Sequence, residues 1–161
     1  SMVPFSHLLW GSVWLGIATD AVSRARAFVQ AAARKTPGVT PPIATRLAEV
    51  TTQLQVMRTG LYALGREYQE LLEKPEKERI DTLSSVGFAL RLNNIKITTS
   101  QLAVQIVNEA MLICGIAGYR NNNPFSLGRH LRDAHSAALM IANDRVLATN
   151  ASLLLLHKSD E

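Results

Sequence analysis

The chain has 161 residues, of which 47% are hydrophobic and 19% charged, the composition of a folded domain rather than a disordered segment. Its formal charge is +4, but the basic residues are spread from Arg24 to Lys158 and aromatics make up only 6%, which argues against a nucleic-acid-binding surface. Cys114 is the only cysteine, so no intrachain disulfide can form, and we expect a reducing, cytoplasmic location.

The first segment is apolar but has the periodicity of an amphipathic helix. Apolar residues recur at steps of three and four between Phe5 and Lys35, and a second set widens that face, so we expect this helix to be covered on more than one side. The two sets are Trp10, Trp14, Ile17, Ala21, Ala25, Phe28 and Ala32, and then Val13, Val22 and Val29. Polar residues interrupt the run, and it lacks a basic start and a cleavage site, so we predict neither a membrane span nor a signal peptide.

The second segment carries the most regular pattern in the chain. Thr40 is the predicted N-cap, with Pro41 and Pro42 in the first helical turn. The apolar residues that follow alternate at four and three over four heptads, which predicts a long helix packed lengthwise against others. They are Ile43, Leu47, Val50, Leu54, Met57, Leu61, Leu64, Tyr68 and Leu71. Gly60 and Gly65 would each permit a close helix crossing.

Two further helices complete the predicted fold. A charged link at 73–78 precedes a third helix from about Lys77 to Ile113, and a fourth runs from about Leu127 to Leu156 with Ser126 as its N-cap. A polar patch in the third helix, at Asn93, Asn94, Thr98, Thr99 and Ser100, indicates a kink, a buried polar network or the lining of a pocket. No segment alternates with the period of two that strands require. We therefore predict an all-α fold, an up-and-down four-helix bundle of long antiparallel helices over 1–161.

The segment between the third and fourth helices carries the candidate functional residues. Gly115 and Gly118 allow backbone conformations and close approaches that a Cβ would block. Arg129 and Arg132 share one helical face, with Asp133 beside them. Two interpretations stay open for these three charges: a salt-bridged helix start, or a site where arginine and the turn's backbone amides hold an anionic ligand.

Other chemistry finds little support in the sequence. His130, Asp133 and His135 are close along the chain, but only His130 and Asp133 share a helical face, and no second ligand pair stands elsewhere. We therefore expect no metal site. A lone cysteine at a helix end, such as Cys114, usually has a packing role rather than a nucleophilic one.

The order of these motifs resembles a known family. A Gly-Ile-Ala-Gly-Tyr turn at 115–119, then Pro124, then Arg-His-Leu-Arg-Asp-Ala at 129–134 match the turn, proline loop and helix opening of the C-terminal helical domain of the acyl-CoA dehydrogenase superfamily. The resemblance covers essentially the whole chain. It implies an N-terminal helical domain and a middle β domain that this chain does not contain, so we expect the isolated chain to be inactive.

The resemblance also implies a cofactor and partners. In the family an Arg-x-x-Phe-Gly motif ends the first helix, and its arginine reaches the FAD pyrophosphate of a neighbouring subunit; here Arg34 and Gly38 are kept and proline replaces phenylalanine. The glycine turn helps to hold the same flavin. The FAD-binding candidates are therefore Arg34, Gly115, Gly118 and Tyr119. The expected partners are a second copy, in a homodimer or homotetramer, and an acyl thioester substrate.

The chain departs from the family at the catalytic base. Many members carry a glutamate about eight positions after the Arg-Asp pair, and Ile141 occupies that place here. An isoleucine cannot abstract a proton, and Asp144, nearly one turn away, is only a weak substitute. Three interpretations follow: part of a flavoprotein that oxidises an acyl thioester, a flavin-dependent monooxygenase of the same fold, or a non-catalytic helical oligomerisation module. The missing glutamate favours the second and third.

Overall fold

The computed structural model describes residues 3–156, and every regular element in this range is a helix. Three helices are long and unbroken, a fourth path is divided into three pieces, and two short helices lie at the ends of the bundle. The long helices are α1 (Val3–Ala33), α2 (Ile43–Leu72) and α4 (Val86–Cys114); the divided path is α6 (Gly128–His135), the 3-10 helix η1 (Ser136–Ala138) and α7 (Asn143–Leu156); the short helices are α3 (Glu76–Leu83) and α5 (Ile116–Tyr119).

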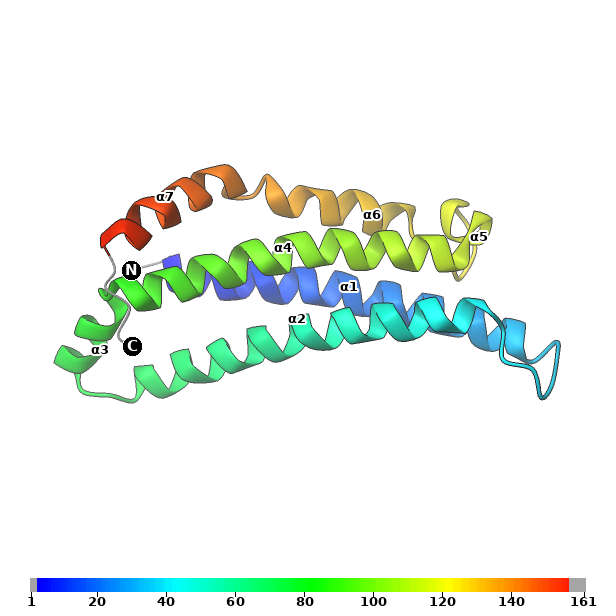
Figure 1. Ribbon diagram of the computed structural model, residues 1–161, viewed down its shortest axis with the longest axis horizontal. Helices are drawn as coiled ribbons and strands as arrows, with labels where there is room; N and C mark the ends of the chain where they lie inside the picture. Colours follow the sequence, from blue (N-terminus) through cyan, green and yellow to red (C-terminus); the bar gives the residue numbers. More distant parts are fainter. Residues whose placement is uncertain (1–2, 157–161) are drawn as a thin grey trace.

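The helices run alternately up and down, as predicted, and α1 and α4 form the central pair. Figure 1 shows α2 on one side of this pair and the α6 to α7 path on the other. The packing agrees, because α4 contacts α1, α2, α6, η1 and α7, and α1 contacts α2 and α6. The prediction of an all-α bundle of antiparallel helices is confirmed.

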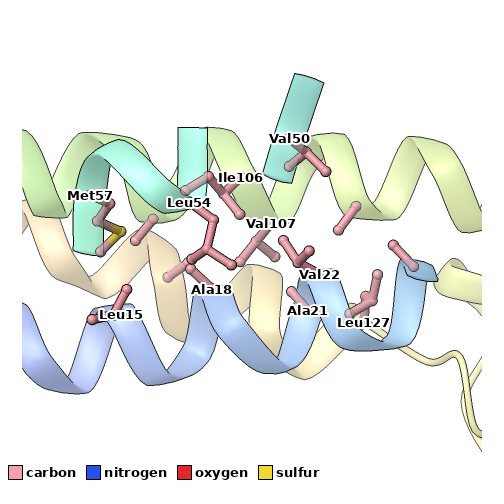
Figure 2. Close-up of a cluster of buried hydrophobic side chains, with 14 of the residues drawn as sticks. Leu15, Ala18, Ala21, Val22, Val50, Leu54, Met57, Ile106, Val107 and Leu127 are labelled. Carbon is pink, nitrogen blue, oxygen red and sulfur yellow. The ribbon is translucent and has the colours of Figure 1, made fainter. Parts of the chain in front are cut away.

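Small side chains bring the two central helices close together. Ala18, Ala21 and Ala25 on α1 are fully buried, as are Ala103 and Ala110 on α4. Figure 2 shows the larger side chains that fill the space between α1, α2 and α4. The predicted seam of α2 supplies much of this filling: Val50, Leu54, Met57, Leu61, Leu64 and Leu71 are buried.

The two glycines of α2 behave differently. A Cβ on Gly60 would lie 3.3 Å from Ile95 Cδ1 of α4, so the predicted close crossing is found there. A Cβ on Gly65 would have no neighbour within 4 Å, so the same prediction for Gly65 is wrong.

The predicted starts of two helices are wrong. The segment expected as one helix from Lys77 divides between α3 and α4, because the Ser85 side chain accepts a hydrogen bond from the Phe88 amide (3.2 Å) and begins a new helix. Phe88 is 1% exposed, so its burial fixes the direction of that helix. Thr40 does not cap α2, which begins at Ile43 after Pro42 and has no side-chain cap.

The predicted single helix from Leu127 to Leu156 is also wrong. It is interrupted between η1 and α7, where Ile141 has a φ of +54°, a left-handed conformation that a β-branched residue rarely adopts. The predicted Ser126 cap is absent: α6 begins at Gly128, and the residue before it, Leu127, is fully buried and donates its amide to the Gly118 carbonyl (2.7 Å).

Part of the polar patch of α4 forms a hydrogen-bonded polar network, one of its three predicted roles, although Asn94 and Thr98 are exposed. Asn93 donates to the Asn150 side chain of α7 (2.7 Å), and Asn150 donates to Asn94 (2.9 Å). Thr99 and Ser100 are fully buried. Polar contacts of α4 therefore hold α7 in place, in addition to apolar packing.

Candidate functional site

The candidate site starts at the glycine turn where α4 ends. Gly115 has a φ of +56° and donates its amide to Met111 (2.8 Å), which ends the helix. The next residues, Ile116 and Tyr119, are 65% and 74% exposed. Gly118 is buried, and a Cβ there would lie 2.9 Å from Cys114 Cβ. The turn thus has an exposed edge and a glycine required for packing.

Asn123 organises the loop that follows. Its side-chain amide donates to the carbonyls of Ala117 (3.0 Å) and Arg120 (2.9 Å), while its Oδ1 accepts from the Phe125 amide (2.9 Å). Asn122 lies in the left-handed region, with φ of 65°, which asparagine tolerates better than most residues. These bonds fold the loop back onto the glycine turn.

The loop is attached to α1. The Phe125 ring packs edge-on against Phe28, with centroids 5.3 Å apart, and Arg24 donates to the carbonyls of Pro124 and Ser126, both at 3.3 Å. The loop's position is therefore set by α1 as well as by α4.

Arg34 lies just beyond the end of α1, at the same end of the bundle as α5 (Figure 1). Its side chain is exposed, and among residues 3–156 it has no ion-pair or hydrogen-bond partner. The guanidinium is therefore available to a group from outside the chain.

A cleft of about 420 Å³ lies between α1 and α6. Among the residues that line it, His130 Nε2 lies 2.6 Å from Asp20 Oδ2, and Arg24 Nε donates to the same oxygen at 2.8 Å. Burial raises the pKa of Asp20, but the bonds from Arg24 and His130 outweigh it, so the net pKa lies below its usual value. This ion-pair cluster joins α1 to α6.

Two members of the predicted arginine cluster, Arg129 and Asp133, line this cleft. Arg129 Nε lies 3.5 Å from Asp133 Oδ2, and Arg132 Nε lies 3.6 Å from Asp133 Oδ1. The two arginine side chains are 86% and 81% exposed. This geometry agrees with the salt-bridged helix start, the first of the two interpretations left open by the sequence.

Ile141, which occupies the place of the family's catalytic glutamate in the sequence comparison, lies in the turn between η1 and α7. Leu139, Met140 and Ile141 all expose their side chains there, with Leu139 at 78%. Asp144 is exposed in the first turn of α7. The turn therefore presents apolar side chains, and the next carboxylate along the chain, that of Asp144, belongs to the following helix.

A buried lysine holds this turn from inside the bundle. Lys96 of α4 is 0% exposed, and its Nζ donates to the Ile141 carbonyl and to Asn143 Oδ1, both at 2.6 Å. Nζ also lies 5.7 Å from the centroid of the Trp14 ring. Asn143 Nδ2 donates to Ser100 Oγ (3.0 Å), which orients its amide. Burial lowers the pKa of Lys96.

Comparison with known proteins identifies the family. A family model described as acyl-CoA dehydrogenase, C-terminal domain, matches residues 5–141. The chain belongs to this family. No curated protein and no solved structure matched the chain in two further comparisons. The family match begins near the start of α1 and ends at Ile141, so it includes the glycine turn, the loop and α6, and it stops within the turn between η1 and α7.

Three further findings for this acyl-CoA dehydrogenase C-terminal domain concern nucleophilic chemistry, metal binding and membrane crossing. Burial raises the pKa of Cys114 to about 11, so its thiol stays protonated near neutral pH and is a poor nucleophile. Within residues 3–156, no three His, Cys, Asp or Glu side chains gather closely enough to hold a metal ion. No helix in the same range combines the length and apolarity that a membrane crossing requires.

The sequence reasoning missed Lys96, although a signal was present. Lys96 continues the buried face of α4, four residues after Leu92 and seven before Ala103. A lone lysine in a run of core positions is unusual, because a buried cation needs acceptors aimed at it. The residues named for the polar patch surrounded Lys96 but did not include it.

Proposed function

We propose that this chain is the bundle domain of an acyl-CoA dehydrogenase-like flavoprotein, and that it forms part of the FAD site and of the subunit interface. The family match over residues 5–141 is the observation that carries the proposal. Members of the family are generally flavin-dependent.

The residues present fit an FAD contact at the end of the bundle. Arg34 is exposed with its guanidinium available, and Gly115 lies at the same end with open space where a Cβ would be. An exposed arginine suits a pyrophosphate, since its planar fork can donate two hydrogen bonds to phosphate oxygens. The packing of Gly118 against Cys114 explains that glycine without a ligand, so Gly118 would act by shaping the turn.

Each candidate has a limited role in this proposal. Arg34 would bind phosphate oxygens of FAD held by a partner subunit, and Gly115 would let the cofactor approach the backbone closely. Tyr119, with its exposed ring, would cover the cofactor. Bound FAD would supply the electron acceptor for oxidation of an acyl thioester.

The geometry at position 141 favours the flavin-dependent monooxygenase as a second candidate. Ile141 lies where the family resemblance puts a catalytic glutamate, and it offers no titratable group. Asp144 is on α7, beyond the turn. A monooxygenase that uses reduced flavin and oxygen does not need a base at this place, whereas oxidation of a thioester needs one from another part of the protein.

Assembly into a homodimer or homotetramer is the remaining part of the proposal. Phe5, Leu9 and Val13 lie at four-residue spacing on α1 and are each more than half exposed, at 57%, 51% and 52%. Such a stripe at the surface is typical of a face that packs against another protein segment. Light scattering of the protein is expected to give a dimer or tetramer, and a monomer would count against this part.

The FAD contact is tested in the protein that contains this chain. Arg34→Ala is expected to weaken FAD retention during gel filtration, and the matched control Lys35→Ala, which removes a neighbouring positive charge, is expected to retain FAD. Equal retention in both variants would remove Arg34 from the site. Anaerobic addition of acyl thioesters then separates the candidates, because bleaching of the flavin band indicates dehydrogenation, while bound flavin that no thioester bleaches supports the monooxygenase.

A further inference from the structure

The buried amino group of Lys96 lies opposite the one strained turn of the divided fourth path. Lys96 is in the middle of α4, and Ile141 is 45 residues later in the chain. Their contact joins the central helix to the turn between η1 and α7.

The acceptors around Lys96 are specific. The Ile141 carbonyl and Asn143 Oδ1 both lie 2.6 Å from Nζ, and the Trp14 ring faces the same group at 5.7 Å. Asn143 is itself held by Ser100, which donates in turn to the Ile97 carbonyl (2.7 Å). None of these acceptors is a carboxylate, so the lysine is held by oriented dipoles and a ring.

The strained backbone of Ile141 needs such a contact. A β-branched residue with a φ of +54° is an outlier that persists only where surrounding groups determine it. Here the carbonyl of that residue is the acceptor of Lys96. The hydrogen bond therefore acts directly on the peptide whose conformation is unfavourable.

We propose that Lys96 is a positioning residue that fixes the 139–142 turn, and with it the wall that Leu139, Met140 and Ile141 present to the ligand of this domain. The hydrogen bonds and the strain do not depend on the identity of that ligand. The statement that the wall faces an acyl thioester rests on the proposed function.

The first test measures hydrogen exchange of the backbone amides in the protein that contains this chain. Lys96→Met keeps the length and the apolar stem and removes the donors, so amides at 139–146 are expected to exchange about tenfold faster or more, since two buried hydrogen bonds are lost. The matched control is Lys74→Met, which makes the same replacement at an exposed lysine paired with Glu78. Lys74→Met is expected to leave the 139–146 segment unchanged.

A second pair of variants keeps the test decisive should Lys96→Met fold poorly. Asn143→Asp retains an oxygen for Lys96 and should keep the turn's slow exchange, whereas Asn143→Leu removes that oxygen and should speed exchange. Unchanged exchange in both Lys96→Met and Asn143→Leu would overturn the proposal. Faster exchange spread evenly over all helices would also overturn it, because the effect would then be global.

The second test separates this inference from the proposed function. Addition of a non-oxidisable acyl thioester analogue to the flavin-loaded protein is expected to perturb the flavin spectrum, and Lys96→Met should require several-fold more analogue. If exchange at 139–146 rises but the analogue binds equally well, the positioning role toward the ligand is overturned. If the wild-type protein binds no flavin, the proposed function fails, and hydrogen exchange alone decides whether Lys96 fixes the turn.

Discussion

Replacement of Gly118 by alanine tests whether the glycine turn is required for packing before any ligand binds. A Cβ at this position would lie 2.9 Å from Cys114 Cβ, 3.1 Å from Met111 Sδ and 3.3 Å from the Met111 carbonyl oxygen. The sulfur can move by rotation of its side chain. The Cys114 Cβ and the carbonyl belong to the last turn of α4 and can move only with the backbone.

The expected cost follows from these contacts. Overpacking a well-filled site costs about 1–3 kcal/mol. Alanine also lowers the conformational entropy of the unfolded chain, which returns about 0.4–1 kcal/mol. We therefore expect Gly118→Ala to lower the free energy of unfolding by about 1–2 kcal/mol, which corresponds to a fall in Tm of about 2–8 °C for a domain of this size.

The assay is urea unfolding of the flavin-free protein, followed by circular dichroism. Gly65→Ala is the matched control, because it makes the same substitution in the interior of α2, where a Cβ meets no atom within 4 Å. It should raise the free energy of unfolding by about 0.5–1 kcal/mol. If Gly118→Ala is as stable as the wild-type protein or more stable, the packing explanation of Gly118 is refuted.

Two further predictions concern single polar contacts. In the same unfolding assay, Ser85→Ala should lower the free energy of unfolding by about 1 kcal/mol, because Ser85 caps α4 by accepting a hydrogen bond from the Phe88 amide. Ser85→Gly should lower it by only a few tenths of a kcal/mol. Asp20→Asn should remove a pH-dependent contribution: the pKa of Asp20 is lowered in the folded state, so its stabilisation is present above its usual value of 3.8 and is lost as the pH falls through the lower folded-state value. Because the Asp20 side chain is 53% exposed, Asp20→Asn and the wild-type protein should differ in free energy of unfolding by less than about 1 kcal/mol above that pH. If the same difference persists at pH 2, it would contradict the assignment of the ion pairs with Arg24 and His130.

The long helices could be predicted because their buried residues follow one period without interruption. The four-three alternation from Ile43 to Leu71 corresponds to a single helix whose seam packs on α1 and α4. Likewise, the residues of the two apolar sets on the first helix are buried or half-buried in a helix that packs on α4 and α2, except for Val13, which is exposed. In both cases the local pattern and the tertiary packing agree.

The interruption at Ile141 could not be predicted from local signals. Residues 139–142 contain no glycine or proline, and their propensities permit a helix. At the break, the Ile141 carbonyl accepts a hydrogen bond from Lys96, a residue on another helix. The division at Ser85 differs, because a serine three residues before a large apolar side chain is a recognisable N-cap, and reading it would have separated α3 from α4.

The candidate site could be predicted only in part, because some of its contacts form between groups that only the folded chain brings together. Gly115 was singled out for its backbone freedom, and its φ of +56° requires glycine. The role of Asn123 as the residue that folds the loop onto the glycine turn depends on three bonds to carbonyl and amide groups whose positions only the folded chain defines. An asparagine directly before Pro124 indicates a turn, and the sequence indicates nothing beyond that.

The central position of α4 has a consequence for synthesis of the chain. Its largest interface is with α1, yet α4 lies in the second half of the sequence, at 86–114. While the ribosome is still making this helix, α1 and α2 can form a hairpin, but the alanine-lined surface of α1 has nothing to cover it. The core therefore closes late, in a step that joins distant segments, and the nascent first half exposes apolar surface that a chaperone can bind.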